Sequence, residues 1–172
     1  MRIVVSTWGT YGDLHPVLGL CAGLRQRGHH LGIATCPLYK ERVEALGYEF
    51  HPLRPDLPDP KDIHDLARRV MDPRTGTKTM LTDVLLPSLR DMDEDLHTAC
   101  KDADLLISHS LVFPSPIVAE RLGIPFFSMV LQPIVFCSAY DPPIPPGVTK
   151  LIGKPMPPPG VMAPLLTVAK SR

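Results

Sequence analysis

The chain has 172 residues, which is enough for one domain with a substantial core and short for a two-domain enzyme. Its 18 basic and 18 acidic residues cancel, so the composition excludes the strongly basic surface by which nucleic-acid-binding proteins hold phosphates. The longest apolar stretch, residues 124–139, is interrupted by Gln132 and Pro133 and is too short to span a bilayer. Residues 1–7 lack the features of a signal peptide.

The four cysteines lie far apart in the sequence, with no CxxC pair and no histidines at metal-ligating spacing: Cys21, Cys36, Cys100 and Cys137. We expect reduced, mostly buried thiols, no metal site and a cytoplasmic location.

The first third of the chain alternates apolar runs with amphipathic stretches. Residues 2–7 (RIVVST) are too apolar to face water on either side, as in a central strand of a parallel sheet. Gly28 and Gly47 stop the two helices that follow. The predicted elements are a helix over 16–27, a strand over 30–36, a helix over 37–47 and a strand over 48–53. This β-α-β-α-β order predicts a parallel sheet with helices on both faces and right-handed crossovers.

The middle of the chain continues the same alternation less regularly. Pro87 is expected to kink or break a long amphipathic helix, and Gly123 to stop a later one. The predicted elements are helices over 59–72 and 77–103, a strand over 104–110, a helix over 115–123 and a strand over 124–131. We therefore predict one α/β domain over residues 1–131, a doubly wound, Rossmann-like parallel sheet.

The composition changes after residue 131. Ten of the 21 prolines fall within residues 132–172, in segments such as DPPIPPG and KPMPPPG. Because proline removes a backbone donor and forbids regular ladders, we expect a Pro-rich extended loop followed by the start of an incomplete segment.

The loop after the first predicted strand, WGTYGDLHP (residues 8–16), is the best candidate for chemistry. Ligands of open parallel sheets bind at the carboxyl ends of the strands. Gly9 and Gly12 would let the backbone turn sharply and approach a ligand, and the following helix N-terminus favours negative charge. The spacing matches neither the GxGxxG dinucleotide motif nor the phosphate-binding P-loop, so neither a redox enzyme nor an NTPase is supported.

Two ionisable residues of this loop have alternative interpretations. Asp13 is either the N-cap of the helix predicted from Pro16 or a general base toward a substrate hydroxyl. His15, which adjoins that proline, suits a capping or surface role as well as a contact with substrate.

Four segments together resemble a known family: GTYGDLHPVLGLCAGLRQRGHHLGIAT, GYEFHPL, AERLGIPFF and VLQPIVFCSAYDPPIPPG. They are similar to the N-terminal domain of GT-B glycosyltransferases of the UDP-glycosyltransferase type. The likeness is to the sterol, macrolide and glycopeptide glucosyltransferases and to the rhamnosyltransferase-like bacterial enzymes. The resemblance covers residues 2–147.

The resemblance implies an inverting transfer of a hexose from a UDP- or dTDP-sugar to a hydroxyl of a lipid-like or natural-product acceptor. It puts Asp13 at the position of the base, where many relatives have a histidine. It pairs this residue with His109 in ISHSLVF, which also suits a cap at the end of the fourth strand; Ser108 and Ser110 offer similar polar groups. The residues expected to contact the acceptor are Trp8, Gly12, His15, Phe113 and Gln132.

Members of the resembled family bind the donor in a second, C-terminal domain, which the 172 residues do not contain. We therefore expect this chain to bind an acceptor and to be inactive alone, with the donor-binding domain supplied in cis or in trans. A fragment, one subunit of a split glycosyltransferase and a decayed product all fit. The alternatives from other classes are a non-catalytic binding or regulatory module and a redox enzyme.

Overall fold

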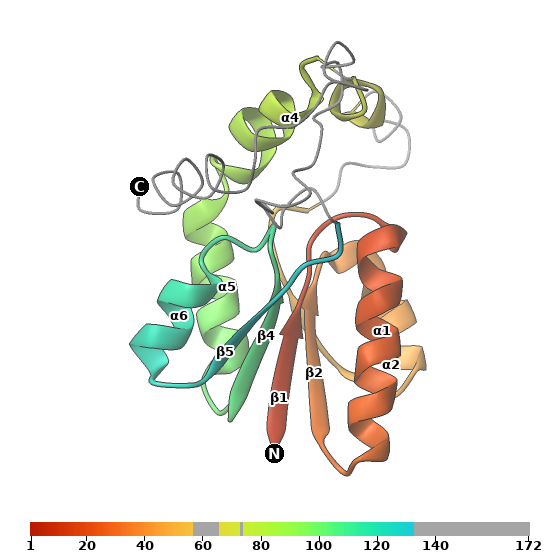
Figure 1. Ribbon diagram of the computed structural model, residues 1–172, viewed down its shortest axis with the longest axis vertical. Coiled ribbons are helices and arrows are strands. Elements are labelled where there is room, and N and C mark those ends of the chain that lie inside the picture. The colour runs from red at the N-terminus through yellow and green to blue at the C-terminus, as the bar shows by residue number, and fades with distance from the viewer. Residues whose placement is uncertain (57–65, 73, 133–172) are drawn as a thin grey trace, which may run out of the picture. The chain divides into compact units, whose positions relative to one another are not determined.

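The computed structural model describes residues 1–56, 66–72 and 74–132 (Figure 1). The chain divides into two units, Met1–Leu131 and Gln132–Arg172, and the fold described below is that of the first. The loop expected over residues 133–172 lies outside the described residues.

Five parallel strands form one sheet in the order β3-β2-β1-β4-β5. Their bounds are Arg2–Ser6 for β1, His30–Thr35 for β2, Glu49–Pro52 for β3, Leu105–His109 for β4 and Phe126–Met129 for β5. The predicted Rossmann-like parallel sheet is thus confirmed, with each strand within the range expected for it.

Helices cover both faces of the sheet (Figure 1). Side chains of a strand alternate between the two faces, and because the strands are apolar, both faces need cover. In β1, Ile3 and Val5 pack on one face and Val4 on the other. The buried thiol of Cys21 belongs to the first core and that of Cys100 to the second. The first face carries α1 (Tyr11–Gln26) and α2 (Lys40–Ala45), and the second carries α5 (Leu89–Cys100) and α6 (Ser115–Leu122).

Helix α1 begins at Tyr11, five residues before the predicted start. Thr10 is the N-cap: its side chain accepts a hydrogen bond from the backbone, and the carboxylate of Asp13 accepts one from the Thr10 backbone N–H in return. This reciprocal pair is a capping box. The interpretation of Asp13 as the N-cap is therefore wrong, and Pro16 lies inside the helix, where it forfeits one backbone hydrogen bond.

The two glycines of the loop also differ from expectation. Gly9 has a φ of +139°, which favours glycine, whereas Gly12 lies within the first turn of α1 and has no positive φ. The sharp turn after β1 therefore depends on Gly9 alone.

The long helix predicted over residues 77–103 is broken near Pro87, as expected. It divides into α4 (Gly76–Thr79), a π-helical turn η2 (Met80–Leu85) and α5. The Leu86 N–H reaches back five residues to the Leu81 carbonyl (2.9 Å), and Pro87 has no N–H to continue the helix. Of the helix predicted over 59–72, residues 66–70 are helical and residues 57–65 lie outside the described ranges.

Candidate active site

Strands β1 and β4 lie side by side in the sheet, and the chain leaves them toward opposite faces (Figure 1). After β1 it enters α1 on one face, and after β4 it enters α6 on the other. Such a topological switch point opens a crevice at the carboxyl ends of the strands, where ligands of open α/β sheets bind. Asp13, in the first turn of α1, and His109, the last residue of β4, lie on the two sides of this point.

The structure brings these two predicted residues together. The Nε2 atom of His109 lies 3.9 Å from Oδ1 of Asp13, within ion-pair range but longer than a hydrogen bond. The side chain of His109 is 3% exposed and that of Asp13 is 14% exposed. The carboxylate is therefore the member of the pair that solvent or a ligand reaches first.

The two oxygens of the Asp13 carboxylate have different surroundings. Oδ2 accepts hydrogen bonds from the backbone N–H of Thr10 (2.7 Å) and from its hydroxyl (3.2 Å). Oδ1 faces His109. The capping box thus fixes the plane of the carboxylate through one oxygen and leaves the other directed at the neighbouring strand.

Burial is the main influence on the titration of His109. It lowers the pKa of the imidazole below its usual value, and the Asp13 charge and the Trp8 backbone carbonyl only partly oppose this effect. The ring is therefore neutral at neutral pH. Among the described residues its buried Nδ1 has no hydrogen-bond partner. A neutral ring has one N–H and one bare nitrogen, so Nε2 can present an N–H on the side of the carboxylate, at a distance longer than a hydrogen bond.

The contact with Asp13 requires a glycine at position 9. A Cβ atom built on Gly9 would collide with Oδ2 of the Asp13 carboxylate, in addition to the strain of the positive φ. A Cβ on Gly12 would meet only the Thr10 hydroxyl, at 3.4 Å. Gly9 is therefore the glycine that allows the carboxylate to approach the loop.

A chain of buried serine hydroxyls, which includes the neighbour of His109 in β4, joins β1, β4 and α6. Ser6 donates to Ser108 across the sheet (2.7 Å), the hydroxyls of Ser108 and Ser115 are 2.5 Å apart, and Ser115 donates to the Val112 carbonyl (2.7 Å). Ser108 was a candidate from the sequence, whereas Ser6 and Ser115 were missed. A polar residue at the carboxyl end of an otherwise apolar strand was the available signal for Ser6.

The residues expected to contact an acceptor differ in their exposure to solvent. Trp8 is 4% exposed, and its indole N–H donates to the Pro55 carbonyl (2.7 Å), so its ring belongs to the core instead of offering an open stacking surface. The others are exposed: Gly12, His15, Phe113 and Gln132. His15 lies beside the Tyr11 ring, with ring centroids 5.4 Å apart.

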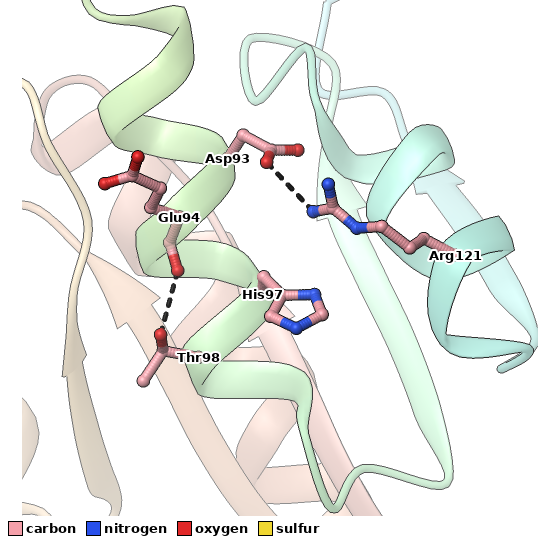
Figure 2. Close-up of a pocket in the computed structure, with 5 residues that line it drawn as sticks. All are labelled: Asp93, Glu94, His97, Thr98 and Arg121. Carbon is pink, nitrogen blue, oxygen red and sulfur yellow. Dashed lines mark hydrogen bonds and ion pairs between the residues drawn. The ribbon is translucent and has the colours of Figure 1, made fainter.

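A hollow of about 370 Å³ is lined by side chains of α5 and α6 (Figure 2). It is lined by Asp93, Glu94, His97, Thr98 and Arg121. Figure 2 shows Arg121 bound to Asp93 (2.9 Å) and Thr98 to the Glu94 carbonyl (2.9 Å). Among the described residues, the buried Nδ1 of His97 has no hydrogen-bond partner. Because the hollow is not lined by residues at the strand ends, we do not assign chemistry to it.

The described part of the chain shows neither a metal-binding cluster nor a membrane-spanning helix. There, no group of three His, Cys, Asp or Glu side chains is arranged to hold a metal ion. No helix in the same ranges combines the length and the apolarity needed to cross a bilayer.

Curated proteins similar to this chain are glycosyltransferases. The chain is 33% identical over 143 residues to a sterol 3-beta-glucosyltransferase of Neurospora crassa, a match that covers 81% of the chain and 9% of the relative. It is 28% identical over 162 residues to the UDP-sugar-dependent glycosyltransferase 52 of Dictyostelium discoideum, covering 89% of the chain and 9% of that protein. The chain thus spans about a tenth of the length of these relatives.

Solved structures agree on the fold. Glycosyltransferase SnogD from Streptomyces nogalater superposes with a TM-score of 0.57 at 17% identity, over 78% of this chain and 35% of that one. The glycosyltransferase of kitacinnamycin gives 0.56 at 25% identity, over 76% and 30%. Glycosyltransferase VinC in complex with dTDP gives 0.54 at 23% identity, over 77% and 35%.

The family model that matches covers most of the chain. Residues 3–140 match the glycosyltransferase family 28 N-terminal domain, in agreement with the resemblance found in the sequence. The chain therefore belongs to the glycosyltransferase family 28 N-terminal domain family, with the Rossmann-like fold of GT-B glycosyltransferases.

Proposed function

We propose that this chain is the acceptor-binding part of an inverting glycosyltransferase, with Asp13 as general base and His109 as its partner. The single observation that carries the proposal is the position of the Oδ1 atom of Asp13. It lies at the switch point of the sheet, on the solvent side of a buried neutral imidazole 3.9 Å away, while Oδ2 is held by Thr10.

In the proposed reaction the acceptor hydroxyl attacks the anomeric carbon of the donor sugar from the face opposite the nucleoside diphosphate. Asp13 takes the hydroxyl proton as the new C–O bond forms, and the diphosphate leaves with the electron pair of the bond that breaks. A positioned base of this kind contributes roughly 10²–10⁴-fold to a rate. His109 presents Nε2 to the carboxylate at 3.9 Å and limits where Oδ1 can lie.

The acceptor and the donor follow from the relatives. Sterol 3-beta-glucosyltransferases suggest a lipid-like hydroxyl acceptor, and the UDP-sugar-dependent relative and the dTDP complex suggest a UDP- or dTDP-sugar. A donor-binding domain would act in cis or in trans, and this chain alone would be inactive. Gly12, His15, Phe113 and Gln132 are the exposed candidates for acceptor contacts. The buried thiols of Cys21 and Cys100 favour a reducing, cytoplasmic location.

The test separates acceptor binding from sugar transfer. Cholesterol delivered from cyclodextrin is titrated into the chain, with the fluorescence of its single tryptophan, Trp8, as the readout. Transfer is measured from radiolabelled UDP-glucose to cholesterol after a donor-binding domain is supplied, fused or separate. We expect Asp13→Asn to bind cholesterol normally and to lose transfer by roughly 10²–10⁴-fold, because asparagine keeps an oxygen for the cap but does not take the proton.

Glu49→Gln at the opposite end of the sheet is the matched control and should leave both readouts unchanged. Full transfer by Asp13→Asn would remove Asp13 from the mechanism. Cholesterol binding without transfer in any arrangement would instead favour the non-catalytic binding module.

A further inference from the structure

Tyr39 is a buried tyrosine whose hydroxyl reaches the loop that carries the candidate base. It ends the short 3-10 helix η1 (Pro37–Tyr39) that follows β2, and its side chain is 3% exposed. Its hydroxyl donates to the backbone carbonyl of Gly9 at 3.0 Å. Burial raises the pKa of Tyr39 to about 12, so this hydroxyl keeps its proton near neutral pH.

The Gly9 carbonyl and the Thr10 N–H belong to the same peptide unit, which is planar and rigid. Tyr39 holds the carbonyl end of this unit, and Oδ2 of Asp13 accepts from the N–H end at 2.7 Å. Any rotation of the peptide plane that breaks one of these hydrogen bonds therefore disturbs the other. Hydrogen bonds arranged in such a chain also polarise one another.

The ring of Tyr39 is anchored independently of its hydroxyl. It packs in the core on the α1 face of the sheet, and the Tyr11 ring meets it edge-on, with centroids 5.0 Å apart and planes at 60°. A phenylalanine would keep these packing contacts. The hydroxyl is thus not required for the ring to pack, and the one hydrogen bond shown for it goes to the loop beside Asp13.

We propose that Tyr39 is a positioning residue that fixes the Gly9–Thr10 peptide plane and, through it, the orientation of the Asp13 carboxylate. The proposal rests on the role of Asp13 proposed above. Tyr39 acts through the backbone and does not touch the substrate.

The test is Tyr39→Phe, which removes the hydroxyl alone. Its matched control is Tyr48→Phe, a second buried tyrosine, whose ring lies under the Arg25 guanidinium (4.4 Å) at the other end of the sheet. One readout is the transfer reaction with the donor-binding domain supplied. The other, independent of activity, is the proton NMR resonance and exchange protection of the Thr10 amide.

We expect Tyr39→Phe to lower kcat about tenfold while the KM for the acceptor stays within about twofold, as loss of one hydrogen bond predicts. The Thr10 amide proton should move upfield and exchange faster, as in Asp13→Asn, because its hydrogen bond to the carboxylate weakens. Tyr48→Phe should change neither readout.

A Thr10 amide that keeps its resonance and protection in Tyr39→Phe would overturn the proposal, whatever the activity. Equal losses of kcat in both phenylalanine variants would also overturn it, since they would reflect general destabilisation. If the amide responds as expected but Asp13→Asn retains full transfer, the positioning of the carboxylate stands and the proposed function fails.

Discussion

The two ends of the parallel sheet use glycine in different ways. At the amino end, Gly28 (φ +82°) and Gly47 (φ +75°) stop the helices before β2 and β3, and a Cβ on Gly28 would have nothing within 4 Å. At the carboxyl end, Gly9 (φ +139°) needs both the unusual backbone angle and the missing side chain, because the Asp13 carboxylate fills that space. The amino end is thus shaped by chain reversal, and the carboxyl end by a carboxylate.

The polar side chains at the two ends of the sheet differ in how deeply they are buried. At the amino end, Arg2 and Glu49 form a partly exposed ion pair at 3.2 Å, and such pairs contribute little to stability. At the carboxyl end, Ser6, Ser108 and His109 are buried, and Nδ1 of the histidine has no partner among the described residues. Buried polar groups cost stability unless they are satisfied, so the unpartnered Nδ1 lowers stability at the end of the sheet where we propose the site.

The largest expected difference between the two ends is in glycine substitutions. Gly9→Ala should lower the free energy of unfolding by about 2–5 kcal/mol, from backbone strain and overpacking against Asp13. Gly28→Ala should cost only about 1–2 kcal/mol, because its left-handed conformation is strained but its surroundings are open. Urea denaturation measures both, and equal costs would contradict the assignment of Gly9 as the glycine in contact with the carboxylate.

A smaller effect is expected from the serine chain. Ser108→Ala should lower the free energy of unfolding by about 1–3 kcal/mol, because Ser6 and Ser115 then lose a buried partner. Ser128, which lies opposite Ser108 in β5 and is exposed, is the matched control. Ser128→Ala should stay within about 0.5 kcal/mol of wild type in the same denaturation experiment.

The smallest effect is a pH dependence that compares His109 with His51, a residue of β3 whose ring lies beside the Arg2–Glu49 pair. Burial lowers the pKa of both His109 and His51 below the usual 6.5, so the unfolded chain binds more protons than the folded one below that pH. Their contribution to stability is therefore complete above about pH 6.5 and is lost as the pH falls through the folded-state values.

We expect His109→Gln and His51→Gln each to flatten this decline, because burial is the largest cause of the lowered pKa at both sites. Glu49, 3.2 Å from His51, supports its protonated form and Arg2, 3.3 Å away, opposes it, whereas Asp13 lies 3.9 Å from His109. The measurement is the free energy of unfolding between pH 7 and pH 5, with the exposed His30→Gln as control. A decline as steep in either variant as in the wild type would contradict the lowered pKa of that histidine.

The fold was predictable because its signals are local. Apolar β-branched runs, helical periodicity and glycine stops recur in a fixed order, and the sheet follows from them. The start of α1 was missed because Pro16 was interpreted as the first helical residue. The Thr10-x-x-Asp13 spacing is the capping-box pattern and would have located the start correctly.

The candidate site was only partly predictable, because its parts come from separate segments. Asp13 was a candidate from its place in the loop and His109 from a family resemblance, but neither their separation nor the different surroundings of the two carboxylate oxygens could be inferred from the sequence. Tyr39 looked like an ordinary helix residue, since only the pairing of β1 with β2 brings it to Gly9. Trp8 looked like a ligand contact from its place in the loop, and its burial depends on the Pro55 carbonyl 47 residues away.

Two buried thiols on opposite faces of the sheet offer a way to follow the layers of this protein separately. Burial raises the pKa of both Cys21 and Cys100 to about 12, so at mildly alkaline pH neither is a reactive thiolate while its surroundings stay closed. Because one belongs to the core beneath α1 and the other to the core beneath α5, an alkylating reagent followed by mass spectrometry would time the opening of each helical layer on its own.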